Sequence, residues 1–180
     1  MSQIPNRYSH IKDTGWLKNR RGSTAVEFAL IGIPFIFMVI GIIEMALMFT
    51  AQSLLEASTA EAARKIRTGA VQQGGGEEEF TEALCGFAAI LIPCDDIQYQ
   101  VLSMENFEDA ENLDDAQFDE EGNLEDQQFD AGDENDVVLI RTSYKYPIKT
   151  PLMWPLLTNN NDTNRIMLST IVLRTEPYAF

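Results

Sequence analysis

The chain has 180 residues and a formal net charge of −15, from 28 acidic and 13 basic side chains. Its length suits one domain with an appendage. The negative charge is concentrated, because residues 68–140 contain 21 Asp or Glu and no Lys or Arg. A body so acidic repels phosphate groups, which argues against nucleic acid as a partner.

An apolar run of 24 residues, FALIGIPFIFMVIGIIEMALMFTA, occupies positions 28–51 and contains a single charge, Glu44. As a helix it would be about 36 Å long, enough to cross a hydrocarbon core of about 30 Å. The buried helix of a soluble protein seldom stays apolar over such a length. Residues 1–22 carry five basic side chains and one acid. By the positive-inside rule, these cations place the N-terminus in the cytoplasm and the chain after about residue 50 outside it.

A cleaved secretory signal peptide is the alternative to an anchor. Such a peptide also begins with basic residues, but its apolar core covers about 7–15 residues and leads to a small-residue cleavage site. Here the apolar core is longer, and Glu44 interrupts it. The sequence therefore predicts a basic cytoplasmic leader over residues 1–22 and a transmembrane helix over residues 23–51.

The helical pattern continues beyond the apolar run. Residues 53–70, SLLEASTAEAARKIRTGA, are mostly good helix formers, and glycines at 69 and 74–76 end the pattern. We expect an amphipathic continuation of the helix over residues 52–73. The face that it packs against another element recurs at spacings of three and four: Leu55, Thr59, Ala62, Ile66 and Ala70.

Three later stretches have the alternation or the β-branched and apolar content typical of strands. They are IQYQV at 97–101, VVLIRTSYKY at 137–146 and RIMLSTIVLR at 165–174. NNNDTN, at 159–164, supplies a turn before the last of them. The predicted fold class is therefore α+β, with the long N-terminal helix packed on a small antiparallel β-sheet in an extracytoplasmic domain over residues 74–180.

An acidic insert separates the first two predicted strands, over residues 105–136. A composition with so many acids and few apolar residues is typical of a solvated, partly disordered loop. Calcium binding is the alternative, but the insert lacks the spacing of an EF-hand: no alternating ligands precede Gly122 and no Glu closes the loop.

The chain has two cysteines, Cys85 and Cys94, both in the part predicted to be extracytoplasmic. In an oxidising compartment they can close a short loop as a disulfide, which would contribute roughly 2–3 kcal/mol in the chain-entropy model. Free buried thiols are the alternative. A metal site is not expected, because the one histidine, His10, lies on the other side of the predicted membrane span.

No pattern predicts catalysis. A hydrolytic triad outside the membrane would lack an imidazole base, and the glycines at 74–76 precede three glutamates that would repel phosphate. The sequence therefore predicts a protein that is not an enzyme, with no cofactor.

Glu27 stands at the start of the apolar run, five residues after Gly22. Cleavage between Gly22 and Ser23 would give Ser23 a new N-terminal amine, four residues from Glu27 on the same helix face. The cation and the carboxylate would then offset each other in an apolar setting. In staggered neighbouring chains, the amine of one could instead meet Glu27 of the next and specify the register. Without cleavage, Glu27 would be a helix-cap acid at the lipid interface.

These features together resemble a known family. Basic residues, Gly, four small or apolar residues, Glu and then a transmembrane helix are similar to the processing site of type IV pilins. The whole of RRGSTAVEFALIGIPFIFMVIGIIEMALMFTAQSLLEASTAEAARKI resembles the N-terminal domain of TadE-like proteins, pseudopilins of the tight-adherence (Flp) pilus apparatus. VVLIRTSYKYPIKTPLMWPLL and RIMLSTIVLRTEPY resemble the C-terminal half of that family.

The resemblance implies a pilin-like fold and a function. Gly22 and Ser23 would flank the bond cut by a prepilin peptidase, and Glu27 and Glu44 would act in assembly. The protein would be a single-pass protein of the bacterial inner membrane that helps to initiate a pilus for surface attachment, or forms its tip. Its partners would be sibling pilins, through the N-terminal helix, and the membrane assembly platform. Phe28 departs from the Tyr that major pilins of this class tend to have, which favours a minor component.

A membrane-tethered binding module is the rival interpretation. Its acidic domain would capture calcium or a basic partner, and it would stay in the membrane instead of entering a fibre.

Overall fold

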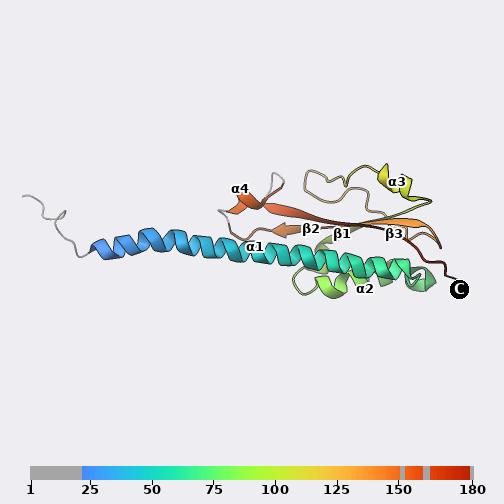
Figure 1. Cartoon of the computed structure of the whole chain (residues 1–180), viewed down its shortest axis with the longest axis horizontal. Coiled ribbons are helices and arrows are strands. Elements are labelled where there is room, and N and C mark those ends of the chain that lie inside the picture. Colours follow the sequence, from blue (N-terminus) through green and yellow to red (C-terminus); the bar gives the residue numbers. More distant parts are fainter. Residues whose placement is uncertain (1–21, 151–152, 160–162, 179–180) are drawn as a thin grey trace, which may run out of the picture. The chain divides into compact units, whose positions relative to one another are not determined.

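The computed structural model describes residues 22–150, 153–159 and 163–178. The predicted leader therefore lies outside the described residues, except for Gly22. The chain divides into two compact units, one that ends at Val39 and one that begins at Ile40. Helix α1, Ser23–Arg67, is continuous over 45 residues and contributes to both (Figure 1).

In the first unit, the side chains of α1 are exposed. From Ser23 to Val39 nearly every residue is exposed, and only Gly32 and Phe37 are half-buried. The exposed side chains are large and apolar, among them Phe28 (78%), Leu30 (74%) and Ile31 (73%). Across the described residues, α1 is the one helix long and apolar enough to cross a membrane.

In the second unit, α1 has a buried face. The predicted amphipathic face is confirmed at four positions, since Leu55, Thr59, Ala62 and Ile66 are fully buried, whereas Ala70 lies after the end of the helix and is half-buried. The buried face also begins earlier than predicted, inside the expected transmembrane segment, and recurs every three or four residues from there: Gly41, Glu44, Met48 and Ala51. The expected continuation to residue 73 instead ends at Arg67.

This face of α1 packs on a three-stranded antiparallel sheet, as predicted. The strands are β1 (Ile97–Met104), β2 (Val137–Pro147) and β3 (Asn164–Arg174), in the order β1-β2-β3. Val101 pairs with Ile140 and Thr142 with Ser169. The side chain of Thr142 meets that of Thr59 with 2.6 Å between their oxygens, and both residues are fully buried.

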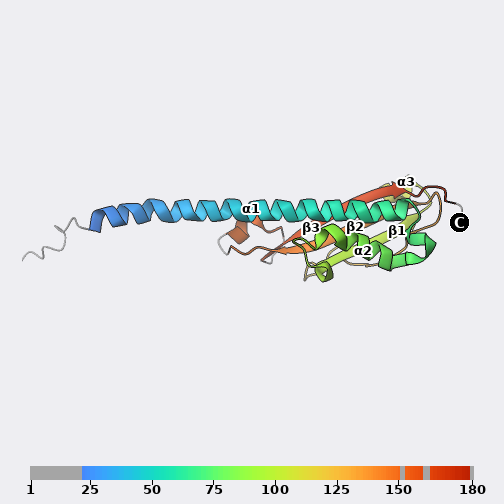
Figure 2. The same ribbon diagram turned by 90° about the horizontal axis from the view of Figure 1, so that it is seen from below.

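A second helix, α2 (Gly76–Ala88), follows a short helical turn over residues 71–75 and was not predicted. Gly74 and Gly76 have positive φ, which glycine adopts without strain, so the chain reverses there before the new helix. Phe80 and Leu84, one turn apart, are buried. The ring of Phe80 packs against Tyr99 of β1, at 5.2 Å between centroids. Helices α1 and α2 thus cover the same face of the sheet (Figures 1 and 2).

The acidic insert is anchored to the sheet at defined points, which differs from the expected partly disordered loop. It contains the short helix α3 (Phe107–Glu111), and Val101 of β1 exchanges backbone hydrogen bonds with the segment around Phe129. On the face of the sheet away from α1, Arg141 donates to a backbone oxygen of the insert and Lys145 to the side chain of Asn123. The two basic side chains of β2 therefore attach to the sheet a segment whose acidic side chains repel one another.

The connection between β2 and β3 contains another short helix, α4 (Trp154–Leu157). The indole of Trp154 donates to the backbone oxygen of Ile148 at 3.1 Å. Helix α4 lies beside α1 at one end of the sheet (Figures 1 and 2).

Candidate functional site

The residues predicted to flank a cleaved bond, Gly22 and Ser23, stand at the start of α1. Both are exposed. A Cβ added to Gly22 would meet no atom within 4 Å. The fold therefore neither shields this bond nor requires a glycine there, so any requirement for glycine would come from an enzyme that acts on the chain.

Glu27 lies in the second turn of α1, and its carboxylate accepts a hydrogen bond from the Ser23 hydroxyl at 2.8 Å. The first turn holds no acid. A capping carboxylate would instead serve the free N–H groups of the first turn, so this geometry does not match the interpretation as a helix cap. The side chain of Ser23 already reaches Glu27, and an amine on Ser23 would therefore start within one turn of that carboxylate.

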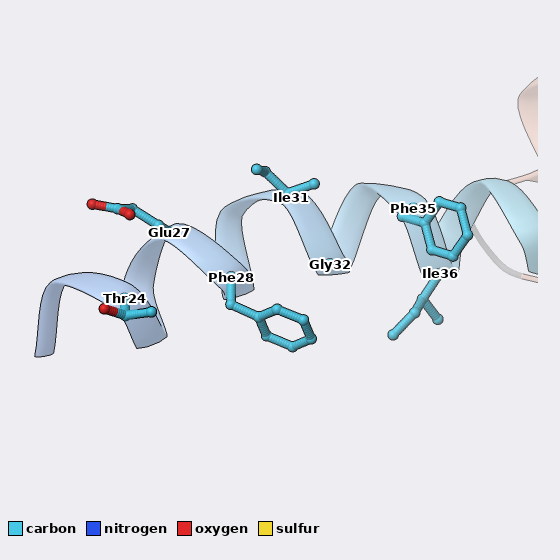
Figure 3. Close-up of a pocket in the computed structure, with 7 residues that line it drawn as sticks. All are labelled: Thr24, Glu27, Phe28, Ile31, Gly32, Phe35 and Ile36. Carbon is cyan, nitrogen blue, oxygen red and sulfur yellow. The ribbon is translucent and has the colours of Figure 1, made fainter.

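The surroundings of Glu27 are apolar. Figure 3 shows Glu27 and Ile31 on one side of the helix, with Phe28 and Ile36 on the other. These side chains line a shallow hollow over Gly32, against which the ring of Phe28 lies. Every side chain that lines the hollow comes from α1 itself. The hollow is therefore a surface feature of one helix and contains no constellation for chemistry.

Glu44, the second acid of the apolar run, has a different environment, because it is only 5% exposed. Its carboxylate accepts hydrogen bonds from the Lys149 backbone N–H and from the Thr150 hydroxyl, each at 3.0 Å. The phenol of Tyr146 donates to it at 3.5 Å. The donors described for Glu44 thus come from the end of β2 and the connection that follows it.

The pKa of Tyr146 is shifted in this environment. Burial, and after it the negative charge of Glu44, raises the pKa of the Tyr146 phenol to about 12. The phenol of Tyr144 and the hydrogen bond to Glu44 act in the same direction. Tyr146 therefore remains a neutral hydrogen-bond donor to the carboxylate at neutral pH.

The structure brings Cys85 and Cys94 together as a disulfide, with 5.5 Å between their Cα atoms. Cys85 is near the end of α2, and Cys94 comes shortly before β1. The link therefore ties α2 to the start of the sheet and constrains the turn between them.

The acids of the insert do not assemble into a site. Among the described residues, no group of three or more His, Cys, Asp or Glu side chains could hold a metal ion. Hydrogen bonds from the side chain and backbone of Asn123 lower the pKa of Asp119. That carboxylate stabilises a turn of the insert, a local structural role.

Comparison with known protein families adds one finding. Residues 22–64 match the family model of TadE-like proteins. This match confirms the resemblance of the N-terminal block. It begins at Gly22, before the predicted cleavage point, and ends three residues before the end of α1. The sheet, the acidic insert and the C-terminal segments that resemble the family lie outside the match. No curated protein and no solved structure matches the chain.

Sequence reasoning found the residues of this TadE-like segment but not the partners of Glu44. Tyr146, Lys149 and Thr150 lie more than 100 positions from it. The sequence did hold one signal, a carboxylate on the same face of the helix as Met48 and Leu55, which requires donors when that face is buried.

Proposed function

We propose that this protein is a minor pilin or pseudopilin that helps to assemble a tight-adherence pilus, at its initiation or its tip, and has no catalytic activity. The observation that carries the proposal is the match of residues 22–64 to TadE-like proteins, which coincides with an exposed apolar helix. Surface attachment would be a property of the finished pilus.

In this proposal α1 anchors the protein in the bacterial inner membrane. The basic leader remains in the cytoplasm, and the sheet and its insert are extracytoplasmic, in keeping with the positive-inside rule. A reporter enzyme fused after Phe180 should therefore be active only outside the cytoplasm. A fusion active only inside would reverse the orientation and contradict the proposal.

A prepilin peptidase would cut between Gly22 and Ser23. Gly22→Leu tests this step cleanly, because an added side chain at this position meets nothing in the fold. The variant should accumulate uncut in the membrane, while wild type should yield a mature chain that begins at Ser23, as measured by mass spectrometry. A mature Ser23 terminus in Gly22→Leu, or an uncut wild-type chain in piliated cells, would contradict the assignment.

The apolar side chains of α1 would pack against sibling pilins, and the assembly platform would receive the processed chain. Glu27 would pair there with an N-terminal amine, its own or that of a neighbour. A charge without a partner costs about 2.5–3.5 kcal/mol at the centre of a bilayer on insertion scales, so pairing with a neighbour's amine would favour one register, whereas pairing with its own amine would only offset the charge.

Glu27→Gln separates processing from assembly, because it removes the charge and keeps the size and polarity. The variant should insert and be cut normally, but cross-link poorly to sibling pilins and support few pili. Glu56→Gln is the matched control, since Glu56 is an exposed acid of the same helix, hydrogen-bonded to Gln52. Wild-type cross-linking and piliation by Glu27→Gln would show that its charge is not used in assembly.

A further inference from the structure

The connection between β2 and β3 exposes apolar surface beside α1. Leu156 is 75% exposed and Trp154 is 37% exposed. Pro155 and Lys149 are also exposed. We call these four side chains the α4 patch.

The α4 patch has a fixed place on α1. Glu44 binds the backbone N–H of Lys149 and the hydroxyl of Thr150, as described above. One turn earlier on α1, Gly41 lies against Met153, whose Cε would be 3.3 Å from a Cβ added to that glycine. The residues on both sides of the patch are therefore held at the level of Gly41–Glu44.

The buried face of α1 begins at Gly41, so, if α1 spans the membrane as in the proposed function, the outer boundary lies near this level and not near residue 50, where the sequence placed it. From Ser23, 21 helical residues reach Ile43, and at about 1.5 Å per residue they cover about 31 Å, close to the thickness of a hydrocarbon core. Ile42 and Ile43 are more than half exposed, so the apolar surface of α1 continues to this level.

We propose that the α4 patch contacts the lipid headgroup region on the extracytoplasmic side of the membrane. The sheet unit would then touch the bilayer in addition to its continuity with α1. Trp is enriched at this depth. The N–H of Trp154 is already donated to Ile148, so its ring can enter the interface without an unsatisfied donor, and Leu156 adds apolar area. Lys149 can extend its ammonium towards lipid phosphates.

The charge distribution supports lipid as the occupant. The chain has 28 acidic side chains, yet residues 137–161 include none. The part of the connection that carries the α4 patch is therefore free of the acids that anionic phosphates would repel, and Asp162, near the start of β3, is the one acid of the connection. A sibling protein is the other candidate to cover the patch, and the test distinguishes it.

The test measures the depth of Trp154 by fluorescence quenching. Trp16→Phe leaves Trp154 as the one tryptophan of the full chain, which is reconstituted alone in phosphatidylcholine vesicles. Lipids brominated near the headgroup should quench it, aqueous iodide should not, and its emission should shift to the blue relative to the protein in lipid-free detergent solution. Intermolecular disulfide scrambling is checked by confirming the Cys85–Cys94 link in each sample.

Two reporters placed in a Trp16→Phe, Trp154→Phe background calibrate the result. Phe107→Trp, at a half-exposed position of α3 in the insert, should be quenched by iodide and not by brominated lipid. Phe35→Trp, in the apolar part of α1, should be quenched by lipids brominated deep in the acyl chain.

The outcomes distinguish this inference from the proposed function. If Phe35→Trp reports lipid but Trp154 behaves like Phe107→Trp, the α4 patch does not contact the membrane and the inference is wrong, while the anchor stands. If Phe35→Trp also fails to report lipid, α1 is not a membrane span and both proposals fall. Protection of Trp154 from iodide and lipid alike, lost when the protein is diluted into excess lipid, would identify a second protein chain as the occupant and overturn the inference.

Discussion

The hydrogen bonds of Glu44 lead to a sharp prediction for Glu44→Ala. The carboxylate is 5% exposed and binds the Lys149 N–H and the Thr150 hydroxyl, each at 3.0 Å. The substitution removes the acceptor from these two donors and from the Tyr146 phenol at once. We expect the connection between β2 and β3 to detach from α1 locally, with the β-ladder intact.

The magnitude follows from which donor can find a new partner. Thr150 is half-exposed, so its hydroxyl can bind water instead. The Lys149 N–H loses its described acceptor, and a donor left unsatisfied costs about 1–3 kcal/mol. The buried Tyr146 phenol also loses Glu44, but its contact at 3.5 Å is at the limit of a hydrogen bond and contributes less. With a central value of about 2 kcal/mol, local opening should become about 30-fold more frequent. Glu44→Gln keeps an acceptor oxygen, and at about 1 kcal/mol it should have an effect of about fivefold.

Amide hydrogen exchange of Lys149 measures this opening directly, in the full chain in lipid nanodiscs. It is a better readout than global unfolding, because removal of a buried charge recovers its desolvation cost and masks part of the loss. The amide of Ile140, inside the ladder, should exchange as in wild type. Glu56→Ala, which removes an exposed acid from the same helix, should leave Lys149 unchanged.

The reasoning would be refuted by equal exchange of the Lys149 amide in wild type and in Glu44→Ala. That result would mean that something other than Glu44 protects this amide. It would also remove one of the two contacts that place the α4 patch on α1.

Three further predictions concern the sheet unit. The Thr59 hydroxyl donates to the backbone oxygen of Leu55, so the Thr142 hydroxyl is the donor in the hydrogen bond between the two threonines. Thr59→Val leaves that donor unsatisfied and should lower the free energy of unfolding, measured with denaturant, by about 1–3 kcal/mol, more than Thr142→Val does. The double variant should be nearly neutral, because it removes both partners. Non-reducing peptide mapping should recover Cys85 linked to Cys94, whereas alkylation of both thiols in freshly quenched cells would contradict the disulfide. Because the pKa of Tyr146 is raised from 10 to about 12, its contribution to stability is complete below pH 10 and declines as the pH rises through 12, which thermal unfolding across that range measures.

The fold was predictable where one physical pattern dominated. Alternation identified the strands, and the apolar run identified the first half of α1. Helix α2 was missed because the glycines at 74–76, where it begins, indicated only the end of the preceding helix. Its core face was nevertheless present in the sequence at helical spacing: Phe80, Leu84 and Ala88. A search for this period on both sides of Gly76 would have found it.

The insert shows what a composition cannot predict. Its acidity indicates solvation, and most of its acids are indeed exposed. Its attachment depends on Arg141 and Lys145 of β2, which lie on the face of the sheet away from the helix. Their acceptors, the backbone oxygen of Asp114 and the side chain of Asn123, follow no period. Such contacts are decided by loop geometry.

The two acids of the apolar run differ in what the chain provides for them. A carboxylate removed from water must be compensated by hydrogen bonds or by a cation. Glu44 receives donors from its own chain, so it has little need of a neighbour. Glu27 is exposed, and the partner described for it is the neutral hydroxyl of Ser23. If α1 enters lipid as proposed, Glu27 is the carboxylate that still requires a cation, and cleavage before Ser23 would supply an amine, in its own chain or in a neighbour. In the proposed assembly the register is accordingly set at Glu27, while Glu44 holds the sheet unit on its own helix.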